Sequence, residues 1–160
     1  MIKVWRICRR RHATTAFSGE GARRSAGRWA HAGVPVVYTA ESASLAVVEM
    51  LVRMDPEDAP NHYVLIGATI PDEVPRSILT VPDLPENWRA YPPPESTRAL
   101  GDQWLADGKT AVLMVPSTVV PQEGNYLLNP VHPDMARIAI DQPDPFAFDP
   151  RLWSALAGKH

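Results

Sequence analysis

A single carboxylate interrupts an otherwise apolar stretch of the chain. Glu49 lies within residues 45–52, and the other seven residues of this stretch are apolar. Removing an ionised carboxylate from water costs several kcal/mol even after relaxation, so a helix this apolar would ordinarily carry leucine or alanine there. In such surroundings the local dielectric is low, and a carboxylate interacts strongly with a nearby positive charge. Glu49 is therefore the first candidate for a catalytic group.

The competing interpretation places Glu49 on the solvated edge of an amphipathic helix. Projected at about 100° per residue, Leu45, Val48 and Val52 form one stripe, and Glu49 falls beside that stripe rather than opposite it. This placement weakens the solvated-edge interpretation but leaves it open.

Three further polar side chains complete a candidate site. Arg28 stands in the tripeptide Gly27-Arg28-Trp29, Tyr38 lies at the end of an apolar run predicted as a strand, and Ser117 follows a second such run. Each has an ordinary structural explanation: a surface arginine, a half-buried strand residue, and a turn after Pro116. Taken singly, the ordinary explanations are favoured. The order of the residues along the chain is the more informative feature.

Several familiar classes of site leave no trace in the sequence. The histidines show no i,i+4 or Cys-x-x-Cys type of spacing, so a metal site is not expected. There is no phosphate-binding P-loop, and Gly19-Glu20-Gly21 is interpreted as a turn. Ser117 lacks the Gly-x-Ser-x-Gly context of a nucleophilic serine, which argues against a Ser/His/Asp triad. The histidines are His12, His31, His62, His132 and His160.

Length and composition predict a single domain over residues 1–160. The formal net charge is -2 and 45% of the residues are hydrophobic, which is ordinary for a soluble protein and gives no global footprint for nucleic acid. Cys8 is the only cysteine, so a reducing compartment, the cytoplasm, is expected. No hydrophobic segment follows the charged N-terminus, and no apolar run approaches the roughly 20 residues that span a bilayer. We therefore expect neither secretion nor membrane insertion.

Positive charge is concentrated in the first 28 residues, which hold seven arginines of the 16 lysines and arginines in the chain. This cluster suits an anionic ligand or an acidic segment of a partner. An ordinary solvated face is the alternative. The seven are Arg6, Arg9, Arg10, Arg11, Arg23, Arg24 and Arg28.

The elements that must position the candidate site follow an α+β pattern. Short β-like runs are separated by turn signals, without the regular strand-helix alternation of a doubly wound sheet. We therefore predict a compact domain with short mixed or antiparallel strands and a few helices. The predicted strands cover residues 4–8, 34–38, 63–70, 78–81, 111–115 and 137–140.

Two helices are predicted between these strands. Prolines bunched in residues 82–94 indicate an irregular connection before the second helix, with Leu84, Trp88 and Tyr91 available to hold it against the domain. The first helix is predicted over residues 43–54, with Ser42 as N-cap and Asp55-Pro56 as its stop, and the second over residues 97–106, with Ser96 as N-cap and Asp107-Gly108 as its stop.

The ordered set of short motifs resembles the RES domain, the toxin half of bacterial RES/Xre toxin-antitoxin modules, which is named for its Arg, Glu and Ser positions. The resemblance extends from about residue 5 to residue 140. One departure is visible, because the family's loop commonly reads Gly-Gly-Arg-Trp-Asn, whereas Ala26 and Ala30 flank the tripeptide here. The matching motifs are Gly27-Arg28-Trp29, residues 36–40, residues 44–49, Val115-Pro116-Ser117 and residues 125–130.

The resemblance implies a fold like that of ADP-ribosyltransferase toxins and an enzyme that degrades NAD by hydrolysis or phosphorolysis. NAD would be the substrate, with no metal. The protein would then be the toxin of a type II toxin-antitoxin system that arrests growth. It also implies an Xre-type helix-turn-helix antitoxin as partner, a homodimer within a larger complex, and DNA contact only through the antitoxin.

The same resemblance assigns roles to three charged residues. Glu49 would stabilise an oxocarbenium-like transition state and hold a ribose hydroxyl, since departure of neutral nicotinamide needs no general acid. Arg28 would bind the pyrophosphate with its planar fork of donors, and Arg6 is a second candidate anchor.

Four uncharged residues complete the expected site. Tyr38 would stack on the cationic nicotinamide. Ser117 would hydrogen-bond the ribose or the nicotinamide amide. Trp29 and Asn125 are expected to contact the substrate.

Three alternatives to NAD degradation stay open. Some members of the family transfer ADP-ribose to a specific protein. A module that binds a nucleotide or an acidic peptide through its basic region would explain the arginines, but it would gain nothing from Glu49. Direct DNA binding through residues 9–11 is disfavoured by the acidic balance and by the lack of a helix-turn-helix pattern there.

Overall fold

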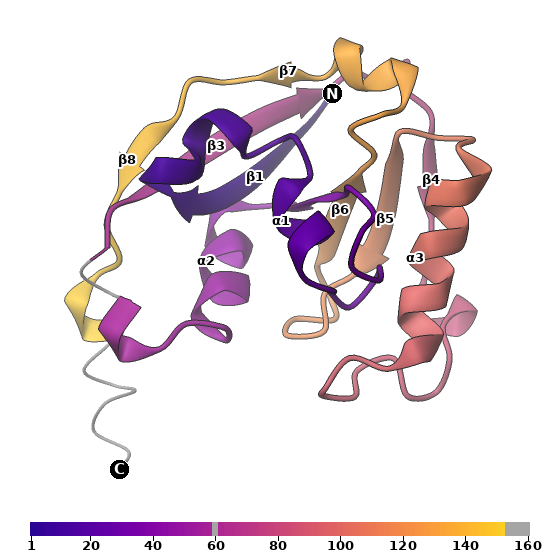
Figure 1. Ribbon diagram of the computed structural model, residues 1–160, viewed down its shortest axis with the longest axis horizontal. Coiled ribbons are helices and arrows are strands. Elements are labelled where there is room, and N and C mark those ends of the chain that lie inside the picture. Colours follow the sequence, from indigo (N-terminus) through magenta and orange to yellow (C-terminus); the bar gives the residue numbers. More distant parts are fainter. Residues whose placement is uncertain (59–60, 153–160) are drawn as a thin grey trace.

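The computed structural model describes residues 1–58 and 61–152, and it confirms an α+β architecture (Figure 1). The strands are β1 (Ile2–Arg9), β2 (Val37–Ala40), β3 (Tyr63–Ile70), β4 (Arg76–Ile78), β5 (Val112–Pro116), β6 (Gly124–Leu128), β7 (Ala139–Ile140) and β8 (Asp144–Phe146). The α-helices are α1 (Glu20–Arg24), α2 (Ala43–Leu51) and α3 (Glu95–Asp107), and the 3-10 helices are η1 (Arg10–Thr15), η2 (Pro56–Asp58), η3 (Val81–Asp83) and η4 (Pro133–Arg137). Within the described ranges, no helix is long and apolar enough to cross a membrane.

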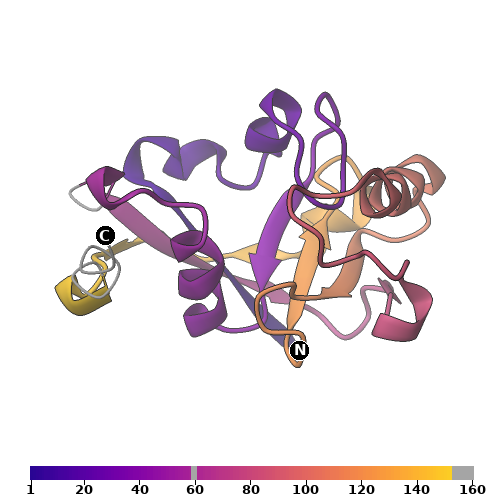
Figure 2. The same cartoon turned by 90° about the horizontal axis from the view of Figure 1, so that it is seen from below.

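These strands form one mixed sheet in the order β4-β5-β6-β2-β1-β3-β7, and β8 also pairs with β3. All the pairs are antiparallel except β4 with β5. β1 and β2 are paired only at Trp5 and Ala40, whereas β1 and β3 are paired along their full length. The sheet is therefore divided into two halves that part between β1 and β2, as Figure 2 shows from below.

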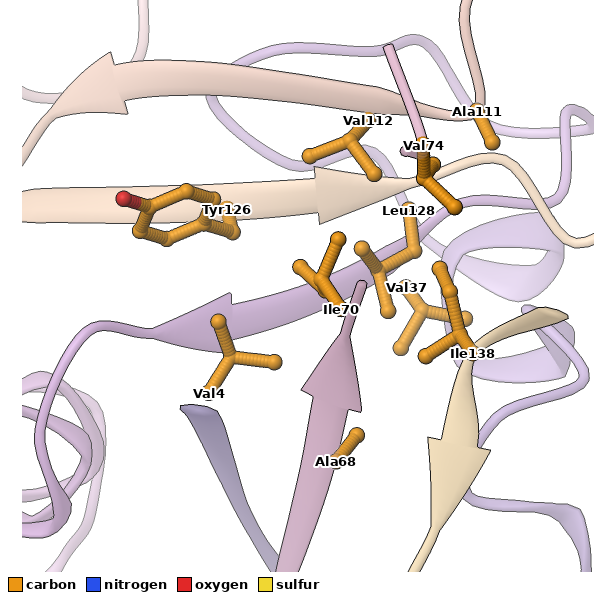
Figure 3. Close-up of a cluster of buried hydrophobic side chains, with 10 residues drawn as sticks. All are labelled: Val4, Val37, Ala68, Ile70, Val74, Ala111, Val112, Tyr126, Leu128 and Ile138. Atoms are coloured by element: carbon orange, nitrogen blue, oxygen red, sulfur yellow. The ribbon is translucent and has the colours of Figure 1, made fainter. Parts of the chain in front are cut away.

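A buried apolar cluster joins the two halves on one face of the sheet (Figure 3). Val4, Ala68 and Ile70 come from the β1–β3 half, and Val37 and Leu128 come from the β2–β6 half. Burial of each larger side chain contributes about 1.5–3 kcal/mol, so this cluster holds the divided sheet together. The whole cluster comprises Val4, Val37, Ala68, Ile70, Val74, Ala111, Val112, Tyr126, Leu128 and Ile138.

Helix α2 packs against β1 and β2 and carries Glu49. As predicted, Ser42 caps it, accepting a hydrogen bond from the backbone N–H of Leu45 at 3.0 Å. The helix ends at Leu51 rather than at the predicted residue 54, and Val52 is 61% exposed. The predicted stripe through Val52 is therefore wrong, because the chain leaves the helix before that residue can face the core.

Helix α3 covers the β4–β5 half (Figure 1). It begins at Glu95, two residues before the predicted start, and Ser96 is inside the helix with its hydroxyl donating to Asn87 rather than capping the helix. Gly108 ends the helix in the left-handed conformation at φ 60°, as the glycine stop predicts.

The proline-rich connection before α3 is held by fewer aromatic anchors than expected. Trp88 is buried with the predicted anchor Leu84 packed in the same cluster, but Tyr91 is 89% exposed. A buried tyrosine hydroxyl needs a hydrogen-bond partner, whereas a fully exposed one is satisfied by water. Tyr91 therefore does not anchor this segment.

Candidate active site

A pocket opens where β1 and β2 part. It is lined by residues of β1, of β2, of α2 with the turn that follows it, and of the start of β6. β1 and β2 pair only at Trp5 and Ala40 and then diverge, so polar side chains from both halves of the sheet can line one pocket. The lining residues are Trp5, Arg6, Ile7, Tyr38, Thr39, Ala40, Ala46, Glu49, Met50, Arg53 and Asn125.

Glu49 lies in the wall of this pocket with its side chain 16% exposed. Its Oε1 accepts two hydrogen bonds, from the hydroxyl of Ser117 at 2.7 Å and from the amide of Asn125 at 2.8 Å. Its Oε2 lies 3.9 Å from a guanidinium nitrogen of Arg53. The carboxylate is thus fixed through one oxygen, while the other has only a long ionic contact.

Ser117 is fully buried and directs its hydroxyl at Glu49. The same oxygen accepts hydrogen bonds from the backbone N–H groups of Val119 at 3.1 Å and Val120 at 3.0 Å. A hydroxyl offers one donor and two acceptor sites, so these three contacts use all of them. The hydroxyl of Ser117 is thus directed at Glu49 and at the following turn, and its expected direct contact with ribose or nicotinamide stays a prediction.

Asn125 combines two roles at the start of β6. It lines the pocket and donates to Glu49, and it stands opposite Ala40 of β2 and Val115 of β5 in the sheet register. Central placement between two ladders fixes its backbone. The structure therefore places Asn125 where it can both orient the carboxylate and touch a ligand.

Arg6 bridges the gap between the diverging strands. One guanidinium nitrogen donates to the carbonyl of Tyr38 at 3.0 Å, while Nε is buried without a hydrogen-bond partner among the described residues. Burial lowers the pKa of Arg6, although an arginine stays cationic throughout the physiological range. Arg6 lines the same pocket as Glu49.

Tyr38 also lines the pocket, and burial raises the pKa of its hydroxyl to about 12. The hydroxyl is therefore neutral at physiological pH, and it has no hydrogen-bond partner of good geometry among the described residues. It packs against Gly27, where a Cβ would lie 2.5 Å from the tyrosine oxygen. This contact gives a physical reason for the glycine in Gly27-Arg28-Trp29.

Arg28 and Trp29 are not among the residues that line the pocket. One Arg28 guanidinium nitrogen donates to the carbonyls of Trp88 at 3.0 Å and Ala90 at 2.7 Å. Burial lowers the pKa of Arg28, and the charge of Glu49 opposes this shift, so the two residues are electrostatically coupled. Trp29 is 3% exposed and packs in an apolar cluster, so its expected contact with substrate stays a prediction that this placement does not support.

Helix α3 holds the loop of residues 27–31. Thr97 donates to a loop carbonyl at 2.7 Å, and Asp102 accepts from the backbone N–H of His31 at 3.0 Å and also contacts its imidazole. A Cβ at Gly101 would lie 1.5 Å from a loop carbonyl oxygen, so the helix approaches the loop at a glycine. The position of Arg28 therefore depends on α3.

Sequence reasoning missed Arg53. The residues of the α2 region that line the pocket are Ala46, Glu49, Met50 and Arg53, which is the i, i+3, i+4, i+7 pattern of one helix face. The missed signal was therefore the arginine four residues after the glutamate. The predicted apolar stripe drew attention to a different face.

The other N-terminal arginines do not join this pocket. Arg9 pairs with Asp58 at 2.9 Å, and residues 9–11 line a separate surface hollow together with Asn61 and His62. The N-terminal arginines are therefore divided between at least two places rather than gathered on one face.

Comparison with known proteins identifies a family and several relatives. A family model described as the RES domain matches residues 3–149. A protein named Toxin Res from Yersinia enterocolitica is 39% identical over 94% of this chain and 99% of its own length, and one of the same name from Pseudomonas putida is 42% identical over 94% and 99%. A Prs ADP-ribosylating toxin from a Sphingobium species is 38% identical over 92% of this chain and 94% of its own.

A solved structure supports the same fold. The crystal structure of the M. tuberculosis MbcT-MbcA toxin-antitoxin complex contains a chain that matches with a TM-score of 0.77, at 18% identity, over 99% of this chain and 90% of that chain. At this level of identity the match speaks for the fold alone. The family model and the relatives show more: this chain belongs to the RES domain family.

Proposed function

We propose that this protein cleaves the bond between nicotinamide and ribose in NAD and acts as the toxin of a toxin-antitoxin system. One observation carries the proposal: the Glu49 carboxylate is fixed at the wall of a pocket by hydrogen bonds from Ser117 and Asn125. An ion pair does not explain the position of the Glu49 carboxylate, because its one ion pair among the described residues is the 3.9 Å contact with Arg53.

The arrangement suits a reaction in which positive charge develops on a sugar. Nicotinamide leaves as a neutral molecule from a cationic ring, so the enzyme needs no general acid. It needs a negative charge placed in advance beside the ribose, and a group of this kind is worth about 10²–10³ in rate. Because Oε1 of Glu49 already accepts two hydrogen bonds, Oε2 is the oxygen available to a ribose hydroxyl and to the developing charge.

The remaining wall of the pocket fits a cationic ring joined to an anionic chain. Tyr38 offers an aromatic face, which attracts a pyridinium. Arg6 supplies a positive charge that favours the phosphate end of the dinucleotide. Both residues carry a buried polar atom without a partner among the described residues, which a polar group of a ligand would satisfy.

The toxin role and the partner are proposed from the relatives. The relatives from Yersinia enterocolitica and Pseudomonas putida are both named Toxin Res, and the structural match is to a toxin-antitoxin complex. We propose an Xre-type helix-turn-helix antitoxin that covers the pocket, a homodimer of this chain in the complex, and DNA binding through the antitoxin.

One competing activity has a specific observation in its favour. The 38% identical relative is named a Prs ADP-ribosylating toxin. Transfer to a protein and release to water or phosphate share the same first bond cleavage and the same use of Glu49. They differ only in the acceptor that reaches the ribose carbon afterwards.

A direct assay tests the proposal. The purified protein is incubated with NAD, with and without inorganic phosphate, and the products are identified by mass. Free nicotinamide with ADP-ribose indicates hydrolysis, a phosphorylated ADP-ribose indicates phosphorolysis, and mass added to protein from a bacterial lysate indicates transfer. Glu49→Gln is the matched control because it keeps the shape of the side chain. Absence of nicotinamide in every arm, with the wild type folded, overturns the proposal.

A further inference from the structure

Three arginines lie in or near the pocket, and their states differ. Arg6 is held between the strands by its bond to Tyr38, and Arg28 is engaged by two backbone carbonyls of the loop before α3. The side chain of Arg53 is 66% exposed. Within the described residues its one ion pair is the contact with Oε2 of Glu49 at 3.9 Å. Arg53 is therefore the guanidinium that is most available to a ligand.

The contact between Arg53 and Glu49 is easily exchanged. Exposed ion pairs contribute little because water and salt screen them and because a long side chain must be ordered to form them. A phosphate group offers a guanidinium two parallel charge-assisted hydrogen bonds, which are shorter and stronger than a contact at 3.9 Å. An anionic ligand in the pocket would therefore draw Arg53 away from Glu49.

This exchange has a consequence for the carboxylate. Oε1 of Glu49 is occupied by Ser117 and Asn125, so Oε2 is the oxygen that must serve the ribose. Arg53 lies beside that same oxygen, and its positive charge there offsets part of the negative charge that the reaction uses. The contact of Arg53 with Glu49 therefore competes with the use of Oε2 by the ribose.

We propose that Arg53 is the pyrophosphate-binding residue and that binding of the pyrophosphate frees Oε2 of Glu49 for the ribose. This inference rests on the proposed function and adds to it. Glu49 and Arg53 both line the pocket and lie next to one another, so one ligand can present its ribose to the first and its adjoining phosphates to the second. The enzyme would thereby prefer a dinucleotide to an unphosphorylated nicotinamide nucleoside, since the nucleoside leaves Arg53 on Glu49.

Two measurements test the inference together. Calorimetry measures the affinity of the protein for ADP-ribose, which needs no turnover, and a nicotinamide-release assay compares kcat/KM for NAD and for nicotinamide riboside. Arg53→Ala is expected to lower both the affinity for ADP-ribose and kcat/KM for NAD by about 10- to 100-fold, because one charge-assisted contact is lost. Nicotinamide riboside should be cleaved no worse by Arg53→Ala than by the wild type. Arg53→Lys should recover part of the loss, and Arg10→Ala, which removes an exposed arginine from the separate hollow, should behave as the wild type.

The outcomes separate this inference from the proposed function. If the wild type binds ADP-ribose through Arg53 but releases no nicotinamide, the inference stands and NAD cleavage is wrong. If the wild type cleaves NAD and Arg53→Ala retains full ADP-ribose affinity, the inference is overturned. An equal loss on NAD and nicotinamide riboside also overturns it, because Arg53 would then act on Glu49 rather than on phosphate. Failure of the folded wild type to bind ADP-ribose overturns it as well.

Discussion

Replacing Ser117 and Asn125 separately by alanine distinguishes a positioning role from a substrate contact. Both side chains donate to the same oxygen of Glu49, at 2.7 Å and 2.8 Å. Only Ser117 also accepts hydrogen bonds from two backbone N–H groups. Each alanine variant therefore removes one contact to the carboxylate, but Ser117→Ala removes a local backbone support as well.

The sizes of the effects follow from these contacts. A hydrogen bond to a charged group is worth about 1.5–3 kcal/mol, so each variant should lower kcat by about 10- to 100-fold if Glu49 loses its position. Ser117→Ala should additionally cost about 1–3 kcal/mol of folding free energy, because it leaves two backbone donors without their acceptor. For a chain of this length each kcal/mol lowers the Tm by about 2–4 °C.

Steady-state kinetics with NAD and thermal unfolding measure both effects on the same samples. We expect similar reductions in kcat for the two variants and little change in KM for Ser117→Ala. The decrease in Tm should be larger for Ser117→Ala than for Asn125→Ala. The double variant should lose less than the product of the single losses, since both contacts serve one oxygen.

The decisive control places Ser117→Ala in a Glu49→Gln background. If the serine acts only through the carboxylate, its removal there should change the residual activity by less than about threefold. A full additional loss in that background, or a raised KM with unchanged kcat, would refute the positioning argument and restore a direct contact between Ser117 and the substrate.

Three further predictions concern the pocket and the loop of residues 27–31. Glu49→Gln should lower kcat by about 10²- to 10³-fold, because the negative charge is lost. Binding of ADP-ribose, measured by calorimetry, should persist because the shape of the side chain is kept. Gly27→Ala should lower the Tm, because its Cβ would lie 2.5 Å from the Tyr38 hydroxyl oxygen, and Tyr38→Phe should restore part of the loss. Asp102, and then Glu95, raise the pKa of His31, so the stability gained by the charged ring is present below the ordinary imidazole pKa of about 6.5 and is lost as pH rises through the raised value. The difference in Tm between wild type and His31→Gln should therefore be largest near pH 6 and disappear in alkaline buffer.

Local patterns predicted the strongest elements well. The strand over residues 63–70 has the predicted ends, because its apolar and β-branched residues are bounded by clear turn residues. β6 was not predicted as a strand, although it lies between β5 and β2. It begins at Gly124-Asn125, and glycine and asparagine are both uncommon in strands. This segment is a strand because it pairs with β2 and β5, which are distant or separate segments of the chain.

The catalytic candidate was visible in the sequence, but the roles of its neighbours were not. The isolation of Glu49 in an apolar stretch indicated a carboxylate with fixed partners. Nothing local shows that Ser117 gives its hydroxyl to that carboxylate, or that Trp29 enters a buried cluster, because both contacts join residues far apart in the chain. Arg53 was overlooked because its exposure and its distance from Glu49 depend on where the helix ends.

The contacts of Glu49 also explain how a carboxylate persists in an apolar helix. Helix α2 packs mainly on β1, whereas Ser117 and Asn125 belong to the β5–β6 side of the divided sheet. The two hydrogen bonds therefore offset part of the desolvation of Glu49 and at the same time connect the two sides of the pocket. An apolar replacement such as Glu49→Leu would leave the side-chain donors of Ser117 and Asn125 without an acceptor. In Glu49→Gln the amide oxygen can still accept a hydrogen bond from both. The catalytic charge and the structural link are thus separable at Glu49, because the carboxylate meets the sheet through one oxygen and the ligand space through the other.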